Sequence, residues 1–370
     1  MSTFSALGIS KSLVKGLNEL GIKTPSEIQE RAIPVLVQGQ TDFIGQAQTG
    51  TGKTAAFGLP LLELVDSKEE NIQALILAPT RELCQQIAKQ LFKFTKYSDK
   101  IYTEAVFGGA KIEEQINRLR RPTQILVATP GRLVDLLQRK ALSLDRVQTV
   151  VLDEADEMLS MGFKQDLNRI LDKTAVTSNK WLFSATMPEG VKKMIRTYLS
   201  QNAERVELKK KGANENIEYQ YVVCNPQDKV KVLLSFLRSQ GENRGLIFCN
   251  TKAAAKTLSK QLQSKNIATD ALEGDMKQKE RDKVMRAFKN ESLQILVSTD
   301  VAARGIDVKG LAYVVHYQVP EHLEYFTHRS GRTGRAGANG LSLCLVSDAE
   351  VMRIRFYEQN LKIKMTRIKD

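Results

Sequence analysis

The chain has 370 residues, which is too long for one ordinary domain and suits two domains of typical size. Its 42% hydrophobic and 26% charged residues exclude a disordered chain, and no run of about 18 apolar residues predicts a membrane span. A formal net charge of +13 favours a polyanionic partner, although a soluble protein that is merely basic would have the same composition.

The cysteines and histidines argue against a metal site built from these side chains. No two of the four cysteines lie at metal-ligand spacing, and there are only three histidines. We expect the cysteines to be buried thiols of a protein in a reducing compartment, and therefore expect a cytoplasmic location, because the N-terminal segment also has no secretory pattern. The cysteines are Cys84, Cys224, Cys249 and Cys344.

The first chemical motif follows the apolar pair Phe43-Ile44. The segment Ala47-Gln-Thr-Gly-Thr-Gly-Lys53-Thr54 nearly matches the phosphate-loop pattern G-x-x-x-x-G-K-[ST], with Ala47 replacing the first glycine. Glycines let backbone N–H groups face phosphate oxygens, Lys53 supplies a charge for the outer phosphates, and Thr54 offers a hydroxyl to Mg²⁺. A plain glycine-rich turn is the alternative. The predicted nucleotide contacts are Gln48, Thr49, Gly50, Thr51, Gly52, Lys53 and Thr54.

Short apolar runs then alternate with longer amphipathic stretches, which is typical of parallel sheets covered by helices on both faces. One predicted strand, Thr149–Leu152, ends in two acids. Asp153 can hold Mg²⁺, usually through water, and Glu154 can orient and deprotonate an attacking water; a simple helix cap is the alternative. The predicted strands are Leu75–Ala78, Ile125–Ala128, Thr149–Leu152, Leu246–Cys249, Ile295–Ser298 and Tyr313–His316.

Three segments of the first half recur in the second half, in the same order and roughly 170 residues further on. Three collinear matches favour two copies of one α/β fold, so we expect a first domain over 1–208, a polar linker over 209–216 and a second domain over 217–370. A capping-box pattern at Ser347–Glu350 predicts the start of the last helix. The repeated pairs are 75–80 with 246–251, 101–108 with 267–274, and 124–129 with 294–299.

The second half has no phosphate loop at the equivalent offset, and it offers an arginine and glycine cluster at 328–335 instead. Arg332 and Arg335, three residues apart among glycines, can reach a phosphate from across a cleft. A solvated or RNA-binding surface remains the alternative interpretation of this cluster.

Taken together, the sequence Asp153-Glu154-Ala155-Asp156, the phosphate loop and the cluster at 328–335 resemble the motifs of the DEAD-box RNA helicases, of the bacterial minimal-core type. The resemblance extends from about Phe4 to Val346, with the motifs in the family's order. It implies two tandem RecA-like domains, ATP and Mg²⁺ as cofactors, and single-stranded or short duplex RNA as the partner. The implied activity is ATP-driven, local and non-processive unwinding of short duplexes, or remodelling of RNA–protein complexes.

The resemblance also implies residue roles at the nucleotide. Gln29 would select adenine with help from Thr24, and Phe4 would pack on the base. Arg332 and Arg335 would be arginine fingers, and Ser330, between them and Arg329, is expected to matter little although many members have an apolar residue there. The implied ribose contact is Asp307, and Gly305 is a further implied nucleotide contact. The residues implied to couple hydrolysis to RNA binding are Asp156, Ser184, Thr186 and His328.

The implied RNA contacts follow strands of both halves, several of them where the internal repeat matched. Taken singly, each of these turns could also be an ordinary connection between a strand and a helix. A DNA-directed translocase and an RNA clamp with vestigial hydrolysis stay open as other functions, as do the RNA target, the protein partners and the oligomeric state. The implied contacts are Pro79, Thr80, Arg81, Gly108, Gly109, Thr129, Pro130, Gly131, Arg132, Asn250, Gln278, Arg281 and Thr299.

Overall fold

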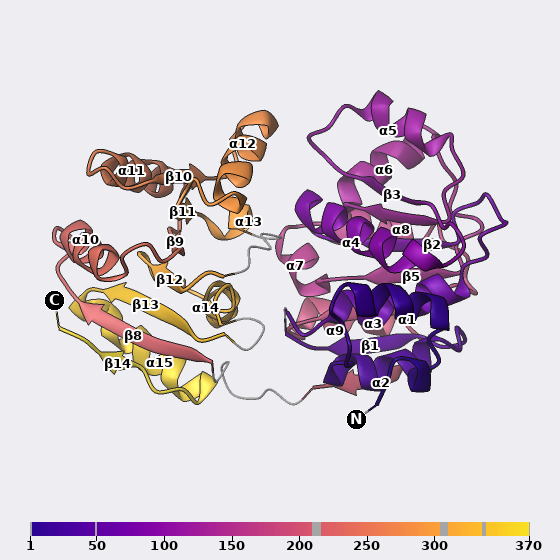
Figure 1. The fold of residues 1–370 in the computed structure, drawn as a ribbon, viewed down its shortest axis with the longest axis horizontal. Helices are drawn as coiled ribbons and strands as arrows, with labels where there is room; N and C mark the ends of the chain where they lie inside the picture. The colour runs from indigo at the N-terminus through magenta and orange to yellow at the C-terminus, as the bar shows by residue number, and fades with distance from the viewer. Residues whose placement is uncertain (1, 49, 209–215, 304–309, 335–337, 370) are drawn as a thin grey trace. The chain divides into compact units, whose positions relative to one another are not determined.

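The computed structural model describes residues 2–48, 50–208, 216–303, 310–334 and 338–369. The chain divides into two compact units, Met1–Leu208 and Lys209–Asp370. Each unit contains one seven-stranded sheet whose paired strands all run parallel, and helices cover its faces (Figure 1). The fold class expected from the sequence, two parallel sheets flanked by helices, is confirmed.

The sheet of the first unit has the strand order β3-β4-β2-β5-β6-β1-β7. Its strands are β1 (Phe43–Gln46), β2 (Ala74–Leu77), β3 (Thr103–Val106), β4 (Ile125–Ala128), β5 (Thr149–Leu152), β6 (Asn179–Ser184) and β7 (Glu204–Glu207). Its helices are α1 (Lys11–Glu19), α2 (Glu27–Leu36), α3 (Lys53–Leu64), α4 (Arg81–Phe94), α5 (Ile112–Leu119), α6 (Pro130–Gln138), α7 (Ala155–Ser160), α8 (Lys164–Leu171) and α9 (Glu189–Tyr198), with 3₁₀ turns at Ser5–Leu7 and Thr95–Tyr97.

The central strands of this sheet are apolar throughout because both of their faces are buried. Ile76 of β2 faces a core built with α1 to α4, while Leu75 and Leu77 face a second core built with α6 to α9. Successive side chains of a strand point to opposite faces, so an unbroken apolar run supplies both cores at once. The sheet is therefore the rigid middle layer, and its strand ends are left to carry chemistry.

The sheet of the second unit has the order β10-β11-β9-β12-β13-β8-β14, which repeats the first order strand for strand. Its strands are β8 (Ile217–Val223), β9 (Gly245–Phe248), β10 (Thr269–Leu272), β11 (Ile295–Ser298), β12 (Tyr313–His316), β13 (Gly340–Val346) and β14 (Thr366–Arg367). Its helices are α10 (Lys229–Ser239), α11 (Lys252–Gln263), α12 (Gln278–Lys289), α13 (Asp300–Ala303), α14 (Leu323–Ser330) and α15 (Val351–Leu361), with a 3₁₀ turn at Asp348–Glu350.

The repeated sequence segments lie on equivalent strands of the two sheets. They fall on β2 and β9, on β3 and β10, and on β4 and β11, and each pair holds the same place in its strand order. The internal repeat therefore marks a duplicated fold. The counterpart of β1 is β8, and the segment that follows it, 224–228, has no glycine, so the glycine-rich phosphate-loop sequence is present in the first copy alone, although Lys229 begins α10 as Lys53 begins α3.

Two terminal features of the second unit refine the sequence prediction. The capping box at Ser347 and Glu350 is present, but the first turn it starts is 3₁₀ and α15 begins at Val351. Beyond that helix lies β14, which pairs with β8 and which the sequence did not predict. All four cysteines are buried and free, as expected. In the part of the chain that the structure describes, no helix is long and apolar enough to cross a membrane.

Candidate nucleotide and RNA site

The predicted site residues of the first unit gather at the carboxyl edge of its sheet. Because parallel strands share one carboxyl edge, the turns that leave neighbouring strands lie next to one another. The phosphate loop and the Asp153 and Ser184 segments leave β1, β5 and β6, which are adjacent in the sheet. The predicted RNA turns leave β2, β3 and β4, which form the neighbouring half. The residues predicted to contact nucleotide and those predicted to contact RNA thus occupy two adjoining stretches of one edge.

The phosphate loop is held in place by its own side chains. Lys53, the first residue of α3, is buried, and its Nζ donates to the carbonyl oxygen of Ala47 at 2.8 Å. The Thr51 hydroxyl donates to the carbonyl oxygen of Gln48 at 2.8 Å. Gly50 and Gly52 have positive φ angles of 83° and 92°, a conformation that favours glycine. A curled backbone of this kind at the start of a helix can direct N–H groups towards an anion, and the helix dipole would add positive potential there.

Gln29 connects this loop to α2. Its Oε1 accepts from the backbone N of Ser26 at 2.9 Å, and its Nε2 donates to the carbonyl oxygen of Gly52 at 3.0 Å. Ser26 in turn donates from Oγ to the carbonyl oxygen of Thr51 at 2.7 Å. An amide has two acceptor and two donor positions, so Gln29 keeps one of each, which is the pair that an adenine edge requires. The loop contacts also fix which way the amide faces.

The two acids after β5 have different environments. Asp153 is 3% exposed, and its Oδ1 accepts from the backbone N of Glu154 at 3.0 Å. Burial raises the pKa of Asp153 well above its usual range, and the positive charge of Lys53 opposes that rise. Glu154 has a φ of 53°, a left-handed conformation that costs a residue with a side chain about 1 kcal/mol. Such strain on an acid beside a buried carboxylate is typical of a functional site.

Asp156 is tied to the segment that follows β6. Its Oδ2 accepts from the backbone N and the hydroxyl of Thr186 at 2.8 and 2.7 Å. Its own backbone N donates to Oγ of Ser184 at 3.3 Å, and that hydroxyl donates to the carbonyl oxygen of Thr186 at 2.7 Å. A shift of one segment therefore moves the other, which suits the coupling role implied by the resemblance.

The predicted RNA turns of the first unit present hydroxyl, guanidinium and backbone groups. Thr80 caps α4 by accepting from the backbone N of Leu83 at 3.2 Å. The Arg81 guanidinium lies over the ring of Phe107, 4.8 Å from its centroid. Arg132 donates from Nη2 to the carbonyl oxygen of Ala110 at 3.0 Å, while its buried Nη1 has no hydrogen-bond partner among the described residues. The other predicted contacts in this stretch are Pro79, Gly108, Gly109, Thr129, Pro130 and Gly131.

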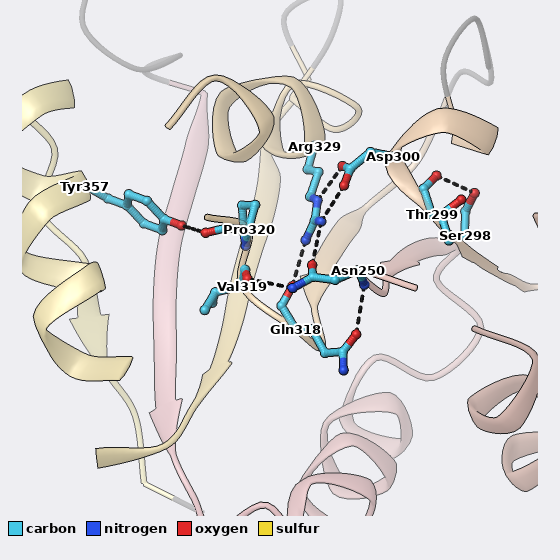
Figure 2. Close-up of polar contacts among 9 residues, drawn as sticks. All are labelled: Asn250, Ser298, Thr299, Asp300, Gln318, Val319, Pro320, Arg329 and Tyr357. Atoms are coloured by element: carbon cyan, nitrogen blue, oxygen red, sulfur yellow. Dashed lines mark hydrogen bonds and ion pairs between the residues drawn. The ribbon is translucent and has the colours of Figure 1, made fainter. Parts of the chain in front are cut away.

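In the second unit a single buried arginine joins three strand ends, as Figure 2 shows. Arg329, 1% exposed, makes a bidentate ion pair with Asp300, with both oxygens at 2.6 Å. It also donates to the carbonyl oxygen of Gln318 at 2.7 Å and to Oδ1 of Asn250 at 2.9 Å. Sequence reasoning assigned Arg329 no role, although its place in the arginine cluster was the available signal. Its contacts connect the ends of β9, β11 and β12 to α14.

The predicted RNA residues of the second unit are more engaged than the sequence suggested. The side chain of Asn250 donates to the carbonyl oxygen of Val319 at 3.1 Å and accepts from Arg329, so it is largely committed inside the unit (Figure 2). Arg281 of α12 donates to the carbonyl oxygen of Ala302 at 2.8 Å. Gln278 and Thr299 start α12 and follow β11, respectively.

Some of the remaining predicted residues lie in the described part of the chain, and others lie outside it. Phe4 is 2% exposed within the hydrophobic core, which leaves little of its ring for a base, whereas Thr24 is exposed. His328 lies on α14, and Arg332 lies two residues beyond the end of that helix. Four predicted residues lie outside the described part of the chain: Thr49, Gly305, Asp307 and Arg335.

A duplicated RecA-like fold with one phosphate loop and a Mg²⁺-type acid pair at the same sheet edge defines the class of two-domain P-loop ATPases that act on nucleic acids. The comparisons narrow this class. Residues 26–194 match the DEAD/DEAH box helicase model, and residues 228–337 match the helicase conserved C-terminal domain model. Together with relatives that are about 40% identical over nearly the whole chain, these matches show that the chain belongs to the DEAD-box family of ATP-dependent RNA helicases.

Individual relatives agree with this assignment. The ATP-dependent RNA helicase CshA of Listeria monocytogenes is 41% identical over 366 residues, which cover 99% of this chain and 70% of that protein. Among solved structures, S. cerevisiae Dbp5 bound to RNA and ADP BeF3 superposes with a TM-score of 0.91 at 32% identity, covering 100% of this chain and 96% of that one. Mss116p bound to ssRNA and AMP-PNP superposes with a TM-score of 0.89 at 28% identity, and the match covers 100% of this chain and 80% of that one.

Proposed function

We propose that this chain hydrolyses ATP in response to RNA and uses the cycle to open short duplexes or remodel RNA–protein complexes locally. The observation that carries the proposal is the shared edge of the first sheet, where the phosphate loop and Asp153 and Glu154 adjoin the turns proposed to contact RNA. An edge that holds both ligands allows the occupancy of one to change the geometry offered to the other.

In this proposal the first unit binds the nucleotide. Gln29 reads the adenine with its remaining donor and acceptor, the loop amides and Lys53 bind the phosphates, and Glu154 orients and deprotonates the attacking water. Arg332 and Arg335 of the second unit neutralise charge that develops on the transferred phosphate, a contribution of about 10³–10⁵ in rate where such arginines have been removed. ATP and RNA together bring the units into the reactive arrangement, and phosphate release relaxes it.

The residues beside the loop fit a Mg²⁺ ion. The carboxylate of Asp153 and the hydroxyl of Thr54 are hard oxygen donors. Burial disfavours the charged form of Asp153, and the positive charge of Lys53 compensates for this only in part, so a bound cation would stabilise the carboxylate further. No cluster of three or more His, Cys, Asp or Glu side chains within the described residues could hold an ion by itself. This suits Mg²⁺, which usually binds one or two carboxylates together with waters and substrate phosphates. When bound, it would polarise the phosphates and neutralise their charge.

For RNA we propose that the turns after β2, β3 and β4, with their counterparts in the second unit, contact mainly sugar and phosphate. Threonine hydroxyls, glycine amides and the Arg81 and Arg132 guanidinium groups suit phosphate oxygens and 2′-hydroxyls, and they read no base sequence. The net charge of +13 supports a polyanionic partner. We further propose that the protein works in the cytoplasm, since its four buried cysteines are free.

Phosphate release with and without single-stranded RNA tests this function. We expect Glu154→Gln to bind ATP while losing about 10²–10⁴ in RNA-stimulated turnover, because the amide cannot accept the water's proton. Lys53→Ala should lose turnover through weaker ATP binding. Asp135→Asn, a change at a half-buried carboxylate of α6 that pairs with Arg139 and has no predicted role, is the control on the same unit.

Three results would contradict the proposal. Undiminished turnover in both Lys53→Ala and Glu154→Gln would remove the site from the reaction. Equal stimulation by DNA of matched length would favour a DNA-directed translocase. Tight RNA binding without any turnover in the unaltered chain would favour an RNA clamp.

A further inference from the structure

A small buried polar cluster lies beneath the end of α14 in the second unit. Nε2 of His316 lies 3.2 Å from Oγ of Ser330 and 3.1 Å from Oγ of Ser342, and the two hydroxyl oxygens are 2.9 Å apart. All three residues are at most 1% exposed. They come from β12, from the last turn of α14 and from β13, so the cluster attaches the end of this helix to two neighbouring strands.

The imidazole of His316 packs against two neighbouring aromatic rings. The ring of Phe326, from α14, stacks on it with centroids 4.8 Å apart, and Phe248, from β9, lies at 6.4 Å. Nδ1 of His316 has no hydrogen-bond partner among the described residues. A buried N–H without an acceptor costs more than a buried lone pair, so the neutral tautomer with its proton on Nε2 is favoured, and Nε2 then donates to a serine oxygen.

The turn that carries Arg332 starts at this cluster. Ser330 ends α14, and Arg332 follows two residues later. On the other side of Arg332, the buried hydroxyl of Thr333 donates to the carbonyl oxygen of Leu311 at 2.5 Å. A Cβ on Gly340 would approach Oγ1 of Thr333 to 2.3 Å, so β13 packs closely against the turn. Arg332 thus lies between two anchors, a serine within the cluster and a threonine fixed to backbone.

We propose that Ser330, Ser342 and His316 are positioning residues for Arg332. Their directional contacts set where the last turn of α14 ends, and this fixes the direction in which the following turn presents its guanidinium. An apolar side chain at 330 would fill the same space but would make no directional hydrogen bond. Apolar packing alone allows the end of a helix to adopt more than one rotation about its axis. The inference rests on the proposed role of Arg332 in hydrolysis, and it assigns a function to Ser330, which the sequence marked as unimportant.

The test compares serine variants of the full chain under saturating RNA. We expect Ser330→Ala and Ser342→Ala each to lower kcat about tenfold with the KM for ATP nearly unchanged, because nucleotide binding belongs to the first unit while a displaced arginine affects the reactive state. The double variant should lose little more than either single one, since both remove the same cluster. Ser259→Ala, a buried serine on α11 of the same unit, is the matched control.

Arg332→Lys separates this inference from the function on which it rests. If Arg332→Lys keeps full kcat, the role of the arginine fails and the positioning role fails with it. If Arg332→Lys loses kcat while both serine variants retain it, the arginine role stands and the positioning role is wrong. Serine variants that only melt at lower temperature, with normal kcat where they are folded, also overturn the inference, as do additive losses in the double variant.

Discussion

At the scale of single residues, the site depends on side chains that satisfy structural and chemical demands at once. Gln29 completes a helix cap, holds the phosphate loop and keeps free the groups that an adenine needs. Arg329 makes four hydrogen bonds to three strand-end segments. The importance of such residues cannot be predicted from sequence, because a motif indicates which residue is present and not how many hydrogen-bond partners it has.

Gly52→Ala should weaken ATP binding at least tenfold. The residue has a φ of 92°, and an added Cβ would lie 2.4 Å from Nε2 of Gln29, so both the backbone and the side chain proposed to contact adenine would be displaced. Titration calorimetry with ATP measures the effect. Gly50→Ala separates the two causes, since its φ is also positive but a Cβ there meets nothing within 4 Å. Equal losses in the two variants would show that the Gln29 contact is unimportant.

His316 should make the second unit sensitive to acid. Burial lowers the pKa of His316 well below its usual value, and the charge of Arg329 adds to this effect. The unfolded chain therefore takes up a proton near pH 6.5 while the folded unit does not, so stability is lost as pH falls below that value, by up to about 1.4 kcal/mol per pH unit. Urea unfolding followed by circular dichroism between pH 5 and 8 measures it. A His316→Gln variant with the same pH profile would contradict this prediction.

At the scale of elements, the sequence predicted six of the strands and missed others, among them the buried central strands β6 and β13 and the strands at the sheet margins. The predicted strands at 125–128, 149–152, 295–298 and 313–316 agree with β4, β5, β11 and β12, because a strand buried on both faces must be apolar along its length. β7 and β14 lie at sheet edges and contain mostly exposed polar residues, so no apolar run indicates them. They form by pairing with a neighbour, which is information from the fold and not from local sequence.

Two capping boxes allow a matched test of how α2 serves the phosphate loop. Ser26→Ala removes a helix cap and the hydrogen bond to Thr51, so we expect a loss of about 1 kcal/mol in stability together with weaker ATP binding. Ser347→Ala removes the equivalent cap before α15 and should cost similar stability without changing ATP affinity. Thermal unfolding and ATP titration give the two quantities. Equal ATP affinities in the two variants would argue that the α2 cap is purely structural.

At the scale of the whole molecule, each unit has its own cores on both faces of its sheet. The family and the two-sheet architecture followed from the sequence because several motifs occur in a fixed order over most of the chain. The anchoring of the arginine turn did not follow, because His316, Ser330 and Ser342 lie on three different elements, 12 to 26 residues apart, and belong to no shared pattern. Contacts of that kind become visible only when strands and helices are placed in space.

The two units should unfold as separate transitions. Trp181, the single tryptophan of the chain, is fully buried in β6 of the first unit, so its fluorescence reports that unit alone, whereas circular dichroism reports both. We expect the two signals to follow different urea curves, because each unit buries its own cores. ATP with Mg²⁺ should shift the unfolding transition seen by fluorescence, which reports the first unit, to higher urea concentration than it shifts the transition of the second unit. Coincident curves would mean that the units unfold as one cooperative body.

The segment after β8 has a consequence for stoichiometry. This strand is the duplicate of β1, yet the turn that follows it reads Cys224-Asn-Pro-Gln-Asp228, which lacks the glycines that let backbone amides converge on a phosphate, although Lys229 then begins α10 as Lys53 begins α3. One duplicated scaffold therefore carries a single nucleotide cradle, and a molecule should saturate at one equivalent of ATP. Because this one turn differs, two copies of the same fold offer different chemistry at equivalent edges of their sheets.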